Sequence, residues 1–75
     1  MKKNEQGYLI GSEQVDIERK TFVVARRQNA RGDFLRVTEW SGEHKGRPNT
    51  IVVPASGVKN LAAAMVRLAT LGEDL

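Results

Sequence analysis

Hydrophobic and polar residues alternate most regularly in the segment from residue 34 to residue 40. Successive side chains of a β-strand point to opposite faces of its sheet, so a period of two predicts a strand. In this segment Leu35 and Val37 share one face, and the other face holds Phe34, Arg36, Thr38 and Trp40. The pattern therefore predicts a strand with one aliphatic face and one face that combines aromatic and basic side chains.

Three further segments have the character of strands. Residues 8–18 alternate weakly, residues 20–28 contain a β-branched and aromatic run, and residues 50–53 form a short apolar run that Pro54 ends. Residues 29–32, Asn-Ala-Arg-Gly, predict a turn, because Asn and Gly tolerate left-handed backbone conformations. Neighbouring strands with short connections pair antiparallel, so we expect a four-stranded antiparallel sheet.

The C-terminal part of the chain predicts a helix over residues 56–72. Ser56 is the expected N-cap, and Gly72 suits the C-terminal cap. One apolar stripe follows helical spacing, and its members are Val58, Leu61, Met65 and Leu68. We expect this stripe to pack in the core against Leu35 and Val37. The fold class is therefore α+β, a curved antiparallel sheet followed by one C-terminal helix (ββββα).

The length of 75 residues allows one domain, residues 1–75, with residues 1–6 and 73–75 expected to fray. A chain this small buries too little apolar surface to be very stable, and small domains usually gain stability from disulfides, metals or a partner chain. The sequence contains no cysteine and one histidine, His44. We therefore expect a homodimer, with no metal or cofactor. The absence of cysteine fits a reducing compartment, and no apolar stretch is long enough to span a bilayer, so we expect a cytoplasmic protein.

Positive charge concentrates in the middle of the chain. Residues 20–47 hold seven Lys and Arg residues against three Asp and Glu residues, a sum of +4, while the whole chain carries +3. A localised basic stripe is typical of a polyanion-binding site. A solvated basic surface would have the same composition, so charge alone leaves both interpretations open.

The aromatic face of the strand at residues 34–40 favours the polyanion interpretation. Phe34 and Trp40 point away from the expected core, and exposed aromatic side chains on one face indicate a binding surface. Aromatic rings stack on unpaired bases while basic side chains such as Arg36 contact phosphates. The alternative is that both aromatic side chains are buried in a dimer interface or under a loop.

Residues 27–36, Arg-Gln-Asn-Ala-Arg-Gly-Asp-Phe-Leu-Arg, resemble a signature of the Pur repeat, the unit of the Pur-alpha family of single-stranded DNA- and RNA-binding proteins. That signature reads basic-x-Asn-x-basic-Gly-x-Phe-Leu-basic. Residues 15–22 resemble the start of the family's first two strands, and residues 50–57 resemble its fourth strand and the start of its helix. The resemblance covers roughly residues 12–71.

The resemblance implies a PUR-repeat (Whirly-like) fold of the same ββββα order, in which two repeats intertwine, so that a single-repeat chain forms a homodimer, as bacterial members do. It implies that Arg27, Asn29 and Arg31 contact nucleic acid and that Phe34 stacks on bases. Purine-rich, guanine-rich targets, transcription regulation and, in a bacterium, association with the nucleoid are implied in the same way. Two residues depart from the family pattern: Asp33 stands where a basic residue is common, and Arg26 where an apolar one is usual.

Other classes of function have less support. The sequence has no cysteine and a single histidine, so it offers no familiar pair of nucleophile and general base. It also lacks a phosphate-binding loop motif. We therefore expect neither enzymatic activity nor a small-molecule substrate. The main alternative is a protein–protein interaction module that uses the aromatic face. Salt separates the two readings, because nucleic-acid affinity falls steeply and log-linearly with salt concentration.

Overall fold

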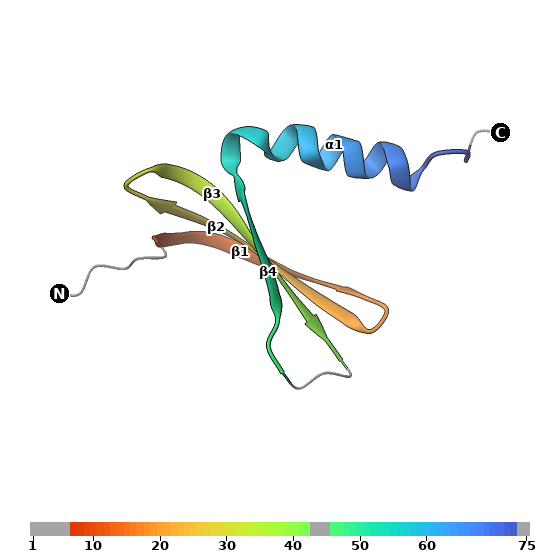
Figure 1. The fold of residues 1–75 in the computed structure, drawn as a ribbon, viewed down its shortest axis with the longest axis horizontal. Helices are drawn as coiled ribbons and strands as arrows, with labels where there is room; N and C mark the ends of the chain where they lie inside the picture. The colour runs from red at the N-terminus through yellow and green to blue at the C-terminus, as the bar shows by residue number, and fades with distance from the viewer. Residues whose placement is uncertain (1–6, 43–45, 74–75) are drawn as a thin grey trace.

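The computed structural model describes residues 7–42 and 46–73, and within them the chain forms four strands and one α-helix (Figure 1). The strands are β1 (Tyr8–Ile17), β2 (Lys20–Asn29), β3 (Gly32–Ser41) and β4 (Asn49–Pro54). They form one antiparallel sheet in the order β1-β2-β3-β4. A short 3-10 turn, η1 (Ala55–Gly57), then leads to α1 (Val58–Ala69). The predicted sheet and C-terminal helix are confirmed. The single histidine, His44, and the expected fraying of residues 1–6, 74 and 75 lie outside the described residues.

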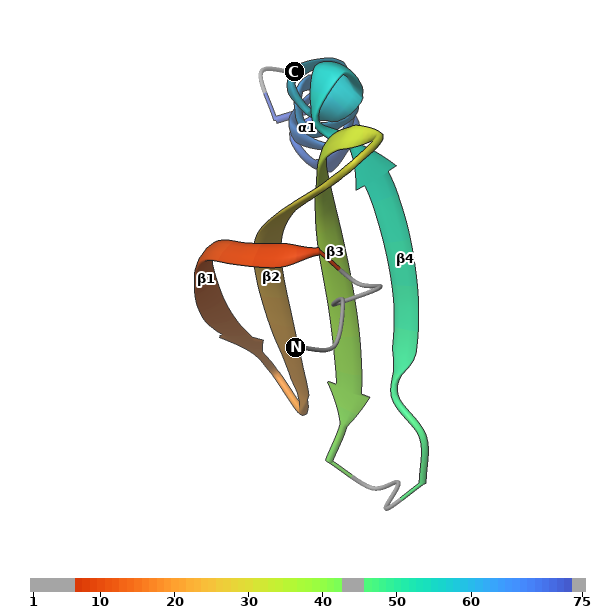
Figure 2. The same ribbon diagram turned by 90° about the vertical axis from the view of Figure 1, so that its left-hand side faces the viewer.

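Two tight connections set the register of the first three strands. Between β2 and β3 only Ala30 and Arg31 form the turn, and Gly32 follows with φ +131°, a conformation that favours glycine. Between β1 and β2, Glu18 takes a left-handed φ of +56°. The pairing of β1 with β2 shifts between Leu9 and Gly11, and β1 bends sharply near its N-terminal end (Figure 2).

This register divides the sheet into two faces, which we call inner and outer. The inner face carries Leu35 and Val37, which the sequence predicted for the core, together with further apolar residues, and these are Val15, Ile17, Phe22, Val24, Ile51 and Val53. The outer face of β3 carries Phe34, Arg36, Thr38 and Trp40, and the β2 residues opposite them are Arg27, Ala25, Val23 and Thr21. The alternation that the sequence predicted for residues 34–40 is therefore confirmed.

The helix begins and ends at other residues than those the sequence predicted. Its N-cap is Gly57, because Ser56 belongs to the preceding 3-10 turn, and no side chain caps the first turn. The helix ends at Thr70, whose hydroxyl donates a hydrogen bond to the Val66 carbonyl at 2.9 Å. Gly72, with φ +90°, lies just beyond this end. Glu73, expected to fray, donates its backbone N–H to the Thr70 carbonyl at 3.1 Å.

The helix extends away from its own sheet instead of covering it (Figures 1 and 2). An apolar cavity of about 380 Å³ lies between the inner face and the helical residues Val58, Leu61, Ala62 and Met65. Met65 is nevertheless 63% exposed, and Leu68 is 71% exposed. Among the described hydrophobic residues only Ala25 is buried. The stripe expected to be core is therefore largely uncovered within one chain.

The dimensions of the chain agree with this missing core. A compact monomer of this mass exposes about 4,600 Å², and 75 residues give a radius of gyration of about 11 Å. This chain exposes 6675 Å² and has a radius of gyration of 14.9 Å. It therefore exposes about 2,000 Å² more surface than a compact monomer would. Within the described part of the chain, no helix is long and apolar enough to cross a membrane.

Candidate nucleic-acid interface

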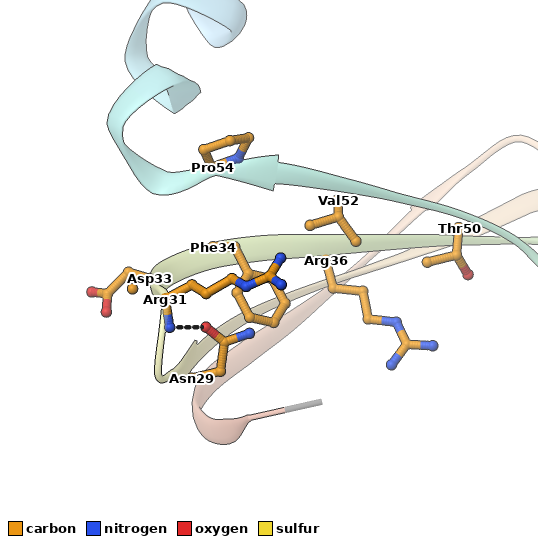
Figure 3. Close-up of a pocket in the computed structure, with 9 residues that line it drawn as sticks. Asn29, Arg31, Asp33, Phe34, Arg36, Thr50, Val52 and Pro54 are labelled. Atoms are coloured by element: carbon orange, nitrogen blue, oxygen red, sulfur yellow. Dashed lines mark hydrogen bonds between the residues drawn. The ribbon is translucent and has the colours of Figure 1, made fainter. Parts of the chain in front are cut away.

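The hairpin between β2 and β3 forms one end of the candidate site. The Asn29 side-chain oxygen Oδ1 accepts a hydrogen bond from the backbone N–H of Arg31 at 2.9 Å, an Asx turn that fixes the orientation of the amide. With its oxygen committed to the turn, the amide presents its NH₂ group, on the Phe34 side (Figure 3). Arg31 is exposed at the tip of the turn. The turn thus fixes Asn29 as a hydrogen-bond donor toward the outer face.

A groove of about 590 Å³ runs from this turn over the outer face of the sheet (Figure 3). Phe34 and Arg36 of β3 line it, and β4 contributes Thr50, Val52 and Pro54. Phe34 is half-buried, so one part of its ring packs on the sheet and another faces the groove. The groove thus combines an aromatic ring, aliphatic side chains from the next strand and arginine side chains.

Arg27 occupies the outer face opposite Phe34 but has a role in holding the chain together. Its Nη1 donates a hydrogen bond to the Gly7 carbonyl at 3.1 Å, and its Nε is buried without a hydrogen-bond partner among the described residues. Gly7 is buried with φ +86°, and a Cβ there would lie 2.5 Å from the Gln28 carbonyl oxygen. Only glycine fits this close contact, so Arg27 and Gly7 together fix the chain just before β1. That Arg27 also contacts nucleic acid stays a prediction.

Trp40 lies at the opposite end of the outer face of β3, facing Thr21 of β2 and 45% exposed. All six residues predicted for the site therefore lie on one side of the sheet, but not in one cluster. Asn29, Arg31, Phe34 and Arg36 line the groove, whereas Arg27 and Trp40 lie outside its lining. Sequence reasoning missed Thr50, Val52 and Pro54, because their place depends on the pairing of β4 with β3.

Both acidic residues of β3 have their carboxylates on the inner face, away from the groove. Asp33 forms an ion pair with Arg26 and accepts a hydrogen bond from Gln28 at 2.9 Å. Figure 3 shows its carboxylate directed away from Phe34, although Asp33 is among the residues that line the groove. Asp33 and Arg26, the two residues that depart from the family pattern, therefore pair with each other.

The second acidic residue, Glu39, is paired in the same manner. It forms an ion pair with Lys20 of β2 and accepts a hydrogen bond from the Asn49 side chain at 3.2 Å. The hydrogen bond from Arg26 is the main cause that lowers the pKa of Asp33, and the hydrogen bond from Lys20 has the same effect on the pKa of Glu39. Both carboxylates therefore stay ionised at neutral pH, and their charges are balanced by neighbouring cations on the inner face.

Among the described residues, no group of three or more His, Cys, Asp or Glu side chains could hold a metal ion. A search of curated proteins finds no match to the chain. A family model described as "PurA ssDNA and RNA-binding protein" matches residues 1–74. This match extends over nearly the whole chain and includes the hairpin, the groove and the helix. The chain therefore belongs to the PurA family of single-stranded DNA- and RNA-binding proteins.

Proposed function

We propose that this chain binds single-stranded nucleic acid in the outer-face groove, with Phe34 stacking on an unpaired base and Arg31 and Arg36 contacting phosphates. The observation that supports this most is the groove itself, which places an aromatic ring between arginine side chains while the acidic side chains of β3 are paired on the other face. Base stacking and phosphate contacts are the two usual sources of single-strand affinity. We propose that the chain binds nucleic acid in the cytoplasm and has no enzymatic activity. We infer that this binding regulates transcription.

The hydrogen-bonding groups of the groove support a preference for guanine. The Asn29 amide has its oxygen in the turn, and arginine side chains only donate hydrogen bonds. Guanine presents two adjacent acceptors, N7 and O6, whereas adenine presents an acceptor and a donor on the same edge. A groove that offers mainly donors therefore favours guanine, and a good bidentate contact discriminates by about 1–3 kcal/mol.

Asn29→Asp tests this preference with little disturbance of the turn. The carboxylate can still accept the hydrogen bond from the Arg31 N–H, but it has no NH₂ group to donate. We expect the variant to lose most of its preference for guanine over adenine in otherwise identical oligothymidine strands. Replacing guanine by 7-deazaguanine, which lacks the N7 acceptor, should weaken binding to the wild-type protein and have little further effect on the variant. An unchanged preference in both experiments would rule out Asn29 as the source of selectivity.

We infer that a second copy of the chain covers the inner face. The exposed apolar residues of the inner face and of α1 have no partner within one described chain, and the sequence has no cysteine for a disulfide. Covering the excess of about 2,000 Å² on each of two copies would bury about 4,000 Å² in total, within the range of obligate homodimers. The helix stripe of one copy fits the inner face of the other, because both are aliphatic. Sedimentation at low micromolar concentration should show a dimer, and a folded monomer of 8.3 kDa alone would refute this inference.

The test of the proposed function compares one sequence as single-stranded DNA, single-stranded RNA and duplex DNA, each labelled with a fluorophore and measured by anisotropy. We expect single strands to bind more tightly than the duplex, because a paired and stacked base cannot present its face to Phe34. The logarithm of the binding constant should fall linearly with the logarithm of the salt concentration. Equal affinity for the duplex and the single strands would refute the proposal. An affinity that does not change with salt concentration would also refute it, and would favour a protein partner for the aromatic face.

A further inference from the structure

Two aromatic side chains stand at opposite ends of the outer face of β3. Phe34 and Trp40 are six positions apart on the same strand, and the strand rise of about 3.3 Å per residue separates them by about 20 Å. Arg36 and Thr38 lie between them on the same face. One base cannot contact both rings, so they are either unrelated or two ends of one extended surface.

The groove follows β3 lengthwise. Along its β4 wall the register pairs Phe34 with Pro54, Arg36 with Val52, and Thr38 with Thr50. All three of these β4 residues line the groove, so it extends from the β2–β3 turn as far as the row of Thr38. Trp40 is the next outer-face position of β3 beyond this row. The groove therefore runs along the strand toward Trp40.

The distribution of charged side chains favours the same path along β3 for a bound polyanion. Because Asp33 and Glu39 are paired on the inner face, the outer face of β3 presents Arg36 and no carboxylate. In the row of Trp40, the outer face carries Asp16, whose carboxylate accepts hydrogen bonds from Thr21 and Gln14. Asp16 lies on β1, two strands and about 10 Å from β3. Among the described residues of β3 and β4, no carboxylate lies on the outer face, so a phosphate chain is favoured over these two strands relative to the β1 side.

We propose that Trp40 is a second base-stacking platform, and that a single strand lies along β3 with one base on Phe34 and a later one on Trp40. This inference rests on the proposed function and specifies the path and length of the ligand. At the stacked rise of about 3.4 Å per step, about six steps, or about seven nucleotides, span 20 Å, and a strand stretched to twice that rise spans it with about four nucleotides. Shorter strands reach one platform only.

Trp40 is the only tryptophan of the sequence, so its fluorescence reports directly on stacking at this position. The experiment titrates the protein with single strands of about two to ten nucleotides that carry one guanine at the 5′ or the 3′ end and thymidine elsewhere. Anisotropy of a labelled strand measures total binding in parallel. We expect the shortest strands to bind without quenching Trp40, and quenching to appear, with a gain in affinity, at a length between about four and seven nucleotides.

Variants separate stacking at Trp40 from other effects of length. Trp40→Ala should abolish the gain, a loss of about 5- to 150-fold for long strands, while leaving the shortest strands unaffected. Trp40→Phe, which keeps an aromatic ring, should retain most of the gain in affinity with strand length. Tyr8→Ala is the matched control, because Tyr8 is an exposed aromatic residue outside the groove, and its loss should leave the length dependence unchanged.

The outcomes distinguish this inference from the function on which it rests. Strands of every length that bind with salt-dependent affinity but leave Trp40 fluorescence unchanged would overturn the second platform and keep the groove. A gain with length that survives in Trp40→Ala would also overturn it, since a strand that bridges two groove sites of a dimer gives that result. If single strands bind at no length, the proposed function itself fails.

Discussion

Phe34→Ala, compared with Phe22→Ala, separates the two faces of the sheet in a single experiment. The sequence has two phenylalanines, and the structure places them on opposite faces. Phe34 lines the outer groove, whereas Phe22 lines the apolar cavity between the inner face and α1. The two substitutions remove the same side chain, so differences between them report on the faces and not on the chemistry of the change.

The expected magnitudes follow from these positions. Loss of one stacking contact at Phe34 should weaken single-strand binding by about 1–3 kcal/mol, which is about 5- to 150-fold in affinity. The salt dependence should stay the same, because no phosphate contact is removed. Phe34 is only half-buried, so its loss should cost much less stability than the about 3–5 kcal/mol typical of a core phenylalanine. If a second copy covers the inner face, Phe22→Ala should have the full core cost and weaken the dimer.

The assays are fluorescence anisotropy with a guanine-containing oligonucleotide and thermal unfolding followed by circular dichroism, both at one protein concentration. We expect Phe34→Ala to change affinity with a small shift in melting temperature, and Phe22→Ala to lower the melting temperature strongly. A Phe34→Ala variant that melts far below the wild type yet binds with unchanged affinity would show that Phe34 is core. The groove would then not be the binding site.

Three further predictions concern charge and assembly. Arg31→Ala should lower the slope of log affinity against log salt by about 0.7 for a single strand and leave the melting temperature unchanged, whereas Arg27→Ala should lower the melting temperature by releasing Gly7. The hydrogen bond from Arg26 lowers the pKa of Asp33 in the folded chain. The ionised Asp33 therefore stabilises the folded state at neutral pH, and this stabilisation is lost as the pH falls below about 4. Asp33→Asn should therefore flatten the acid side of the melting temperature–pH curve, and an unchanged acid side would contradict the pairing. Met65→Glu should convert the dimer to a monomer in sedimentation, and a persistent dimer would place the interface elsewhere.

The features that the sequence predicted correctly are the local ones. Alternation along β3 assigned Leu35 and Phe34 to opposite faces because side-chain direction in a strand depends only on position along it. Asn-Ala-Arg-Gly predicted the hairpin turn because the turn depends on local features of two of its residues, the hydrogen bond that the Asn29 side chain accepts from the Arg31 N–H and the positive φ of Gly32. The presence of a helix followed from its apolar stripe in the same way.

The features that it missed depend on contacts between distant residues. The pairing of Arg26 with Asp33 requires the register of β2 against β3, which spacing alone does not define. The contact of Arg27 with Gly7 joins residues twenty positions apart across a bent strand. Ser56 lost the capping position because the chain makes a 3-10 turn before the helix begins. The uncovered helix was missed because an apolar stripe shows that a face needs a partner without showing which chain supplies it.

The alternation of β3 has a consequence for how this gene can change in length. Every second residue of the strand belongs to the groove and every other one to the inner face, so inserting or deleting one codon within it would exchange the two sets beyond that point. Aromatic and arginine side chains would then enter the apolar side, and aliphatic ones would face the groove. Length variation among descendants of this sequence should therefore be excluded from β3 and concentrate between Ser41, where β3 ends, and Asn49, where β4 begins.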